Sequence, residues 1–219
     1  MTPSTNNINI SLYEKQYDIV QDWLTVDKHI LTIVPVGSGK TFMASVVLPI
    51  FASDERYHKG KDIIYSAPTA AMIKSLIWEP LKASCRANFN IPDSAINNSE
   101  LTIKFPNGIF IRCKSAEQKL NLRGLNVGRW IADEAALYSE EVLMEIFNRL
   151  RPRVGAPDTG GRMIVISTPH GAGPLYQLYQ NALEDKESFH VHQPHTLGEH
   201  TLIAQSSSFR NVTYGISIQ

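Results

Sequence analysis

The sequence predicts an α/β fold, in which a mostly parallel central sheet carries helices on both faces. Apolar, β-branched runs of strand length alternate along the chain with segments whose apolar residues recur at helical spacing. Such alternation is typical of parallel βαβ units. One antiparallel decoration is expected, because two alternating runs flank Pro106-Asn107-Gly108, and Asn-Gly between such runs is a strong hairpin signal.

Length and composition indicate one domain. The chain has 219 residues, 43% of them hydrophobic, which is enough for a core without disulfides or structural metal. The two cysteines, Cys85 and Cys113, have no C-x-x-C spacing and are interpreted as small core residues in a reducing compartment. No apolar run approaches the ~20 residues of a membrane span, and the first residues are polar. We therefore expect a soluble intracellular protein that has no membrane partner.

The charge is balanced overall but locally uneven. With 21 basic and 21 acidic residues, the chain lacks the basic excess of proteins that hold nucleic acid by net charge alone. The stretch 104–129 nevertheless contains six basic residues and one acidic residue. This stretch is either an ordinary solvated face or a sequence-independent, salt-sensitive contact with DNA. The six basic residues are Lys104, Arg112, Lys114, Lys119, Arg123 and Arg129.

The expected elements follow from periodicity and from turn residues. Ser11 and Glu14 form a capping box for a helix that runs to about Leu24, and Pro49 is expected to bend or end a later helix. Pro80 is expected to interrupt another, and 54–61 is predicted to be a loop. The predicted strands are 30–34, 62–67, 101–105, 109–113, 129–132, 162–167 and 189–192, and the predicted helices are 11–24, 41–51, 70–87, 140–150 and about 175–182.

Three parts of unequal order are expected. Residues 1–10 are predicted to be a flexible arm, and 11–194 the folded domain. Residues 195–219 show no clear periodicity and are interpreted as a C-terminal extension or tail.

The central feature is an apolar strand that ends in a glycine-rich loop. Residues 30–41 read Ile-Leu-Thr-Ile-Val-Pro-Val-Gly-Ser-Gly-Lys-Thr. Backbone N–H groups of such a loop can surround a phosphate, with a lysine at the β/γ-phosphates and a hydroxyl on Mg²⁺. Val34 stands where the usual motif has its first glycine, and a chance turn is the competing interpretation. The predicted nucleotide-binding residues are Gly37, Ser38, Gly39, Lys40 and Thr41.

Two adjacent carboxylates complete a candidate ATP site. Asp133 and Glu134 follow the predicted strand 129–132, and ligands of open α/β sheets bind at the carboxyl ends of strands. Asp133 is expected to hold Mg²⁺ and Glu134 to polarise the attacking water. The alternative is an acidic start to the next helix, favoured by the helix dipole.

Further polar residues are candidates for supporting roles. Ser167 and Thr168 end the predicted strand 162–167 at the same sheet edge and are candidate γ-phosphate sensors, or else a plain strand-ending turn. Gln16 is a candidate for adenine recognition, or else a surface residue.

Histidines cluster late in the chain. His-x-His spacing on a strand can chelate a metal, but no cysteine or confirmed carboxylate partner accompanies these residues, so a half-exposed strand is the simpler interpretation. The cluster consists of His190, His192, His195 and His200.

Together these motifs resemble the N-terminal ATPase domain of the large terminase subunit of tailed bacteriophages, over about residues 11–185. The most specific parts of the resemblance are Leu122-Arg123-Gly124 upstream of Asp133-Glu134-Ala135-Ala136, and Ser167-Thr168-Pro169 before His170-Gly171. Further matches are Tyr13-Glu14-Lys15-Gln16, the phosphate loop, Ser66-Ala67-Pro68-Thr69 and the Asn107-Gly108 hairpin.

The resemblance implies a P-loop NTPase fold of the additional-strand (RecA-like) type and an ATP-hydrolysing motor that needs ATP and Mg²⁺. By this resemblance Glu134 is the catalytic base, Arg123 is an arginine finger supplied in trans, and Ser167 and Thr168 couple hydrolysis to movement. It also implies work in the host cell cytoplasm on double-stranded DNA, as a homo-oligomeric ring on a portal protein with a small terminase subunit.

The chain departs from that family in two places. Val34-Pro35-Val36 occupy positions where many terminases carry an arginine, and no acidic cluster of a nuclease domain follows, so nuclease activity is expected elsewhere. Two alternatives stay open. One is the first motor domain of a superfamily 2 helicase, and the other is a nucleotide-binding regulatory relative without motor activity.

Overall fold

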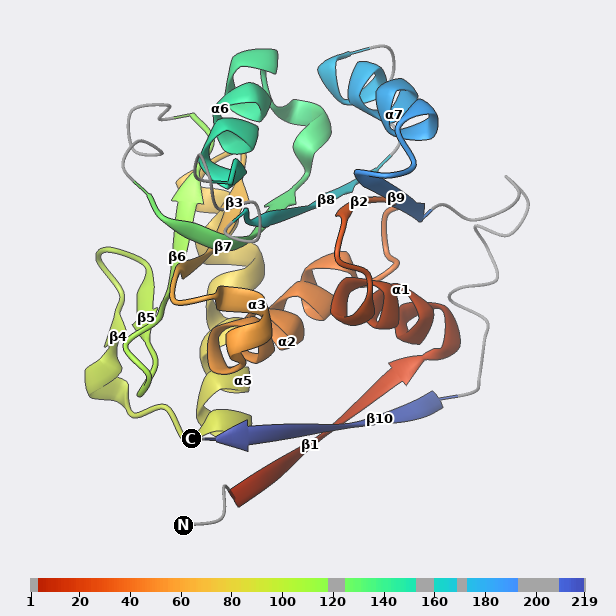
Figure 1. The fold of residues 1–219 in the computed structure, drawn as a ribbon. Helices are drawn as coiled ribbons and strands as arrows, with labels where there is room; N and C mark the ends of the chain where they lie inside the picture. The colour runs from red at the N-terminus through yellow and green to blue at the C-terminus, as the bar shows by residue number, and fades with distance from the viewer. Residues whose placement is uncertain (1–3, 118–124, 153–159, 169–172, 193–208, 219) are drawn as a thin grey trace.

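The computed structural model describes residues 4–117, 125–152, 160–168, 173–192 and 209–218, with side chains from Ile10 up to His192. Its centre is an eight-stranded sheet in the order β4-β5-β6-β3-β7-β8-β2-β9 (Figure 1). In this order, each of the neighbouring pairs from β6 through β3, β7, β8 and β2 to β9 is parallel. The pairs β4-β5 and β5-β6 are antiparallel. This arrangement confirms the predicted fold class. The strands are β2 (His29–Ile33), β3 (Asp62–Ala67), β4 (Ile96–Asn97), β5 (Thr102–Lys104), β6 (Phe110–Ser115), β7 (Val127–Asp133), β8 (Arg162–Ser167) and β9 (Phe189–His192).

The strand order separates the two halves of the candidate ATP site. The strand that leads into the phosphate loop, β2, does not pair with β7, which ends at Asp133, because β8 lies between them. This inserted strand is the mark of the additional-strand, RecA-like class of P-loop fold. Side chains from the ends of β2, β8 and β7 therefore meet along one edge of the sheet.

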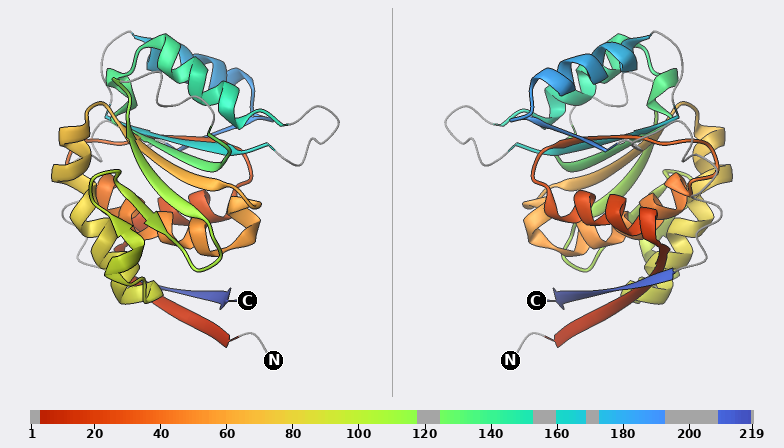
Figure 2. Two further views of the ribbon diagram at one scale, coloured as in Figure 1. Left: turned by 90° about the vertical axis from the view of Figure 1, so that its left-hand side faces the viewer. Right: turned by 90° about the vertical axis from the view of Figure 1, so that its right-hand side faces the viewer.

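Helices cover both faces of the sheet (Figure 2). One face carries α1 (Glu14–Thr25), α2 (Lys40–Ser53) and α5 (Glu79–Phe89), and the other carries α6 (Glu140–Leu150) and α7 (Pro174–Glu184). Successive strand residues point to opposite faces. In β2, Ile30 belongs to the core under α1 and α2, while Leu31 belongs to the core under α6.

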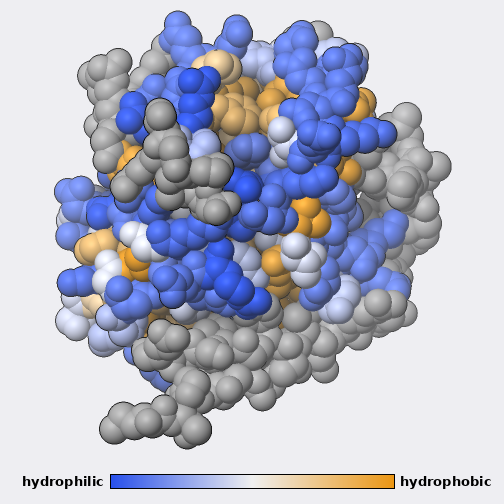
Figure 3. Space-filling view, viewed as in Figure 1, coloured by the Kyte–Doolittle hydropathy of each residue, from blue (hydrophilic) through white to orange (hydrophobic). Residues whose placement is uncertain are grey.

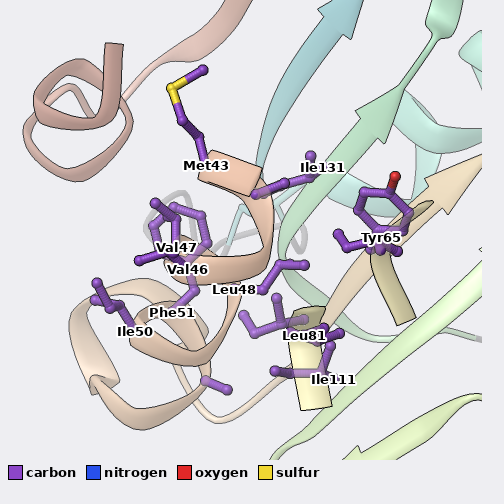
Figure 4. Packing of buried hydrophobic residues seen from close by; sticks show 14 of the residues in the cluster. Met43, Val46, Val47, Leu48, Ile50, Phe51, Tyr65, Leu81, Ile111 and Ile131 are labelled. Carbon is purple, nitrogen blue, oxygen red and sulfur yellow. The ribbon is translucent and has the colours of Figure 1, made fainter. Parts of the chain in front are cut away.

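Helix α2 passes through the larger core, and Figure 4 shows its apolar side chains against residues of neighbouring strands. Met43, Leu48 and Phe51 are fully buried. A bend or an end of the helix is expected at Pro49; the helix continues through Pro49 to Ser53, so the second alternative is wrong. A proline costs about 3 kcal/mol in a helix interior, and burial of nearly every side chain in this helix offsets that cost.

The structure differs most from the sequence-based prediction at the two ends of the chain, where strands form. The flexible arm predicted for 1–10 is wrong from Ser4 onward, because β1 (Ser4–Tyr13) pairs antiparallel with β10 (Phe209–Ile218) along ten residue pairs. Ser11 lies in β1 opposite Asn211 and does not cap α1. The helix begins at Glu14, and the backbone N–H of Tyr13 donates to the Gln16 side chain (3.2 Å). Local pattern cannot reveal a partner strand at the opposite end of the chain.

Two shorter departures have local causes. Residues 54–61, predicted as a loop, contain α3 (Glu55–His58), whose first turn is capped by the Asp54 side chain. The interruption expected at Pro80 occurs just before it. A π-helical segment, η1 (Ile73–Trp78), joins α4 (Ala70–Met72) to α5. A helical turn with one extra residue accommodates the missing N–H of proline.

The predicted hairpin is confirmed. Strands β5 and β6 pair across a turn in which Gly108 has φ +84°. The Asn107 side chain accepts from the Ile109 N–H and donates to the Ala52 carbonyl (2.8 Å), which ties the turn to the end of α2.

The surface in Figure 3 is mostly hydrophilic, with hydrophobic residues in its upper part, where α6 and α7 meet. A groove between these helices is lined by residues that include Leu143, Met144, Phe147 and Tyr176. Both cysteines are buried and free, as predicted. Within the described ranges, no helix is long and apolar enough to cross a membrane.

Ser66 on β3 joins two large side chains beneath the site. Its Oγ accepts from Trp130 Nε1 (2.8 Å) and from the Tyr138 hydroxyl (3.0 Å). All three residues are buried. The serine thus fixes β7 and the segment after Glu134 relative to β3.

Ser66→Ala is expected to lower the free energy of unfolding by about 1–3 kcal/mol, because two buried donors lose their acceptor. Urea denaturation measures the change. Ser45→Ala is the matched control, since the buried Ser45 hydroxyl donates only to Phe42 of its own helix (2.7 Å) and its loss should cost less. Equal losses in the two variants would contradict this role for Ser66.

Candidate ATP-binding site

The phosphate loop lies between β2 and α2. Gly37 and Gly39 have φ of +81° and +78°, a backbone conformation that side chains disfavour. These glycines let the loop turn back over the first turn of α2, whose free N–H groups favour an anion. The loop thus forms where the sequence predicts it.

Lys40 is the first residue of α2, and its side chain lies against the loop. Its ammonium donates to the carbonyl of Pro35 (3.0 Å) and to the hydroxyl of Thr168 (3.2 Å). Burial lowers the pKa of Lys40, against the opposing effect of the carboxylates of Glu134 and Asp133. Carbonyls and a hydroxyl are replaceable partners, so the same ammonium can turn to a phosphate without losing its hydrogen bonds.

Ser38 supplies a test of whether the loop fits an anion. Its side chain is buried, and among the described residues its Oγ has no hydrogen-bond partner. A buried hydroxyl without a partner costs about 1–3 kcal/mol. A phosphate oxygen held by the loop would supply the acceptor, so the residues present fit a bound nucleotide.

Gln16 supports the loop from α1. Its amide donates to the Ser38 carbonyl (3.0 Å), and its carbonyl accepts from the Tyr13 N–H. A Cβ at Gly39 would lie 2.4 Å from the Gln16 amide nitrogen. Gln16 is therefore buried against the loop, which excludes the surface interpretation; its contact with adenine stays a prediction.

Asp133 is the most densely bonded side chain of the site. Its Oδ2 accepts from the hydroxyls of Thr41 (3.1 Å) and Tyr65 (2.7 Å), and its Oδ1 accepts from the Glu134 N–H (2.9 Å). Burial raises the pKa of Asp133, while these three hydrogen bonds act in the opposite direction. Thr41 and Asp133 present oxygen atoms to one point, and oxygen ligands are those that Mg²⁺ prefers.

Sequence reasoning missed Tyr65. The residue lies in the middle of β3 and is fully buried, and burial beside Asp133 raises the pKa of its hydroxyl far above the usual range. A buried tyrosine hydroxyl usually needs a partner. Its place next to Ile63 and Ile64 in a buried strand was the available signal, but the partner depends on the pairing of β3 with β7.

Glu134 stands at the turn that follows β7. Its backbone has φ +50°, which is uncommon outside glycine and costs about 1–2 kcal/mol. Such outliers persist where surrounding contacts hold them, often at functional sites. The turn leaves Glu134 half-buried beside Asp133, whose carboxylate accepts its N–H.

Ser167 and Thr168 connect the two halves of the site. The Ser167 hydroxyl accepts from the N–H of Ala136 (3.1 Å), two residues beyond Glu134, while Thr168 accepts from Lys40. The end of β8 therefore contacts both the phosphate loop and the segment that carries Glu134. This contact excludes a plain strand-ending turn, and the coupling role stays a prediction.

Some predicted residues are not among the described ones. Arg123, with Leu122 and Gly124, falls outside the described residues, as do 169–171 of the Ser-Thr-Pro element and Lys119.

In the described part of the basic stretch 104–129, two arginines form ion pairs within the fold, and contact of the remaining basic residues with DNA stays a prediction. Arg129 is buried and bonded to Asp27 (3.1 Å), and Arg112 is paired with Asp62 (2.6 Å). Both arginines serve the fold, whereas Lys104 is exposed. A count of charges along the sequence cannot tell paired, buried arginines from free ones.

Comparison with known proteins places this geometry in a recognised fold. No protein-family model matches the chain. Among solved structures it is similar to the large terminase of bacteriophage HK97, with a TM-score of 0.66 and 18% identity over 83% of this chain and 39% of that one. It is also similar to the large terminase ATPase domain of Thermus phage P74-26, with a TM-score of 0.58 and 23% identity over 77% of this chain and 69% of that domain.

The chain has the fold of a large terminase ATPase domain. A third similar structure is the large terminase of a thermophilic bacteriophage in complex with ADP, with a TM-score of 0.61 and 17% identity over 87% of this chain and 46% of that one. A 90-residue segment is 36% identical to the ATP-dependent DNA helicase MPH1 of Kluyveromyces lactis, covering 40% of this chain and 8% of the helicase. The chain thus spans less than half of the HK97 terminase and of the ADP-bound terminase, and a small part of that helicase.

Because Gln16 lies so close to Gly39, the effects of substitutions at these two residues on stability are expected to be coupled. In the absence of nucleotide, Gly37→Ala should lower the free energy of unfolding by about 1–2 kcal/mol, from backbone strain alone, because a Cβ there meets no atom within 4 Å. Gly39→Ala should cost more, because its methyl group also displaces Gln16. Urea unfolding measures both changes.

The Gln16→Ala background isolates the steric part of this cost. There, Gly39→Ala should cost about as much as Gly37→Ala, and the double-mutant cycle gives the coupling. An unchanged cost of Gly39→Ala in that background would show that Gln16 does not support the loop as described.

Proposed function

We propose that this chain is the ATP-hydrolysing motor domain of a viral DNA-packaging terminase. The observation that supports this most is the contact between Thr41 and Asp133, which joins the phosphate loop to the end of β7 across the intervening β8. A phosphate cradle, a metal-binding pair and an adjacent carboxylate are the parts that ATP hydrolysis needs.

Each residue has a distinct role in this proposal. The loop N–H groups and Lys40 hold the β- and γ-phosphates, and Thr41 and Asp133 are the residues that would hold Mg²⁺, which would supply positive charge to the phosphates. Glu134 accepts a proton from water as the water oxygen attacks the γ-phosphorus. The bond between the γ-phosphorus and the bridging oxygen then breaks, and that oxygen leaves with ADP. Tyr65 is a positioning residue, because its hydrogen bond orients the Asp133 carboxylate.

Movement would begin at the end of β8. Loss of the γ-phosphate frees the Lys40 ammonium to return to Thr168, the contact present here. Because Ser167 holds the Ala136 N–H, a shift at Thr168 reaches the segment after Glu134. This short path is a physical basis for coupling hydrolysis to motion of the domain.

The proposed partners rest on the similarity to terminase structures. They are double-stranded DNA, neighbouring copies in a ring on a portal protein, a small terminase subunit and a nuclease domain, all in the host cell cytoplasm. The neighbouring copies would supply Arg123 to the γ-phosphate in trans.

A second candidate is the first motor domain of a helicase-like ATPase, favoured by the segment similar to the MPH1 helicase. Both candidates use the same ATP chemistry. They separate on DNA, because a packaging motor moves duplex DNA intact whereas a helicase separates its strands.

Glu134→Gln is expected to reduce steady-state ATP turnover by at least about 100-fold while nucleotide binding is retained, because the amide keeps the size of the side chain but cannot take the proton. Phosphate release and binding of a fluorescent ATP analogue measure the two effects. Glu140→Gln, an exposed acidic residue after the same turn, is the matched control and should hydrolyse at the wild-type rate. A wild-type chain inert even in a pre-assembled ring would remove the motor proposal in favour of a regulatory relative.

Arg123→Ala alone should also be nearly inactive, since arginine fingers contribute about 10³–10⁵ in rate. Mixing Arg123→Ala with Glu134→Gln should restore part of the turnover, because some interfaces then pair an intact Glu134 with an intact Arg123 of the neighbour. Turnover is measured against the total concentration at a fixed ratio. No recovery in an assembly whose wild-type form is active would exclude action in trans.

A further inference from the structure

Three metal-ligating side chains converge outside the ATP site. On β9, His190 Nε2 and His192 Nδ1 lie 3.0 Å and 2.9 Å from the same atom, Oδ2 of Asp22 on α1. The three ligand atoms all lie within 4.8 Å of one another. The side chains are 24–37% exposed, so the group is supported by the fold but open to solvent.

The fold explains how these residues meet. Strand β9 adds to the sheet edge by pairing in parallel with β2, and its side chains alternate between the two faces. Phe189 and Val191 pack on the side of α6 and α7, which turns both histidines toward α1. The carboxylate partner that the sequence did not reveal comes from a helix at the other end of the chain.

We infer that Asp22, His190 and His192 form a binding site for a divalent transition-metal ion of the Zn²⁺ class. Zinc binds imidazole nitrogen at about 2.0–2.1 Å and carboxylate oxygen at about 2.0–2.2 Å, which sets the ligand edges of a tetrahedron at roughly 3.3 Å. The two nitrogen–oxygen distances are already within a few tenths of an ångström of that value. A small outward movement of the rings admits the ion.

The ligand set also selects the ion. Two imidazoles and one carboxylate suit Zn²⁺, Co²⁺ or Ni²⁺ rather than Mg²⁺ or Ca²⁺, which prefer oxygen ligands. Three protein ligands leave a fourth position for water. The thiols are poor competitors, because burial raises the pKa of Cys85 to about 12 and that of Cys113 still further.

The ion would join α1 to the edge of the sheet. Helix α1 carries Gln16, which holds the phosphate loop, and β9 pairs with β2, which leads into that loop. A metal on Asp22, His190 and His192 is therefore a clamp across two elements that support the ATP site. It shares no ligand with that site and does not depend on the function proposed above.

The test uses the full chain without an affinity tag. Calorimetric titration with Zn²⁺, in excess Mg²⁺ and without nucleotide, should give one ion per chain that EDTA removes. His190→Gln, His192→Gln and Asp22→Asn should each weaken binding by at least about tenfold, because each removes a direct ligand. Zinc should raise the Tm of the wild type by several degrees and leave that of these variants nearly unchanged.

Two controls locate the site. The double variant His195→Gln/His200→Gln and the variant Asp133→Asn should bind zinc as the wild type does. Loss of binding in either control, or unchanged binding in His190→Gln and Asp22→Asn, would overturn the inference. Should the ligand variants fail to fold, the visible absorption spectrum with Co²⁺ replaces them as the test. The His195→Gln/His200→Gln variant should then show the absorption bands of a tetrahedral Co²⁺ ion. Absence of these bands would equally overturn the inference.

Discussion

The candidate ATP site depends on one buried carboxylate. Asp133 lies at the end of β7 with its side chain removed from water, which is costly for a charged group unless hydrogen bonds replace the lost hydration. Thr41, Tyr65 and the Glu134 backbone supply those bonds from three different segments. The need to satisfy this carboxylate therefore holds the phosphate loop, β3 and the turn at Glu134 in one arrangement.

The strand order makes that arrangement possible. Because β8 separates β2 from β7, the loop and the carboxylates face each other across the end of a third strand. Thr168 and Ser167 stand at that end and contact Lys40 on one side and the Ala136 N–H on the other. The side chains of the candidate site thus come mainly from segments that follow the ends of strands, while the strands themselves are held by two apolar cores and by the Ser66 hydrogen bonds.

The sheet edge formed by β9 supports β2, which leads into the loop, and also carries the two histidines of the candidate metal site. Strand β9 packs Phe189 against His29 and Phe147, which shields the inner side of the edge. Burial lowers the pKa of His29 to about 4, so that ring is neutral near pH 7 and its Nδ1 accepts from the Met163 N–H. On the opposite face, His190 and His192 meet Asp22. A histidine thus packs against aromatic rings on one face, while two others form a candidate ligand set on the opposite face.

The sequence alone determined the local elements and the chemistry of the site. The ranges of β3, α6, β8 and β9 agree with those expected, because their apolar periodicity and flanking turn residues are local signals. The phosphate loop and Asp133-Glu134 were recognisable for the same reason. Contacts between distant segments were not: the Tyr65 hydroxyl on Asp133, the pairing of β1 with β10 and the approach of Asp22 to the histidines exist only after the chain folds. Residue spacing specifies which groups share a face of one element, whereas strand pairing and helix packing decide which faces meet.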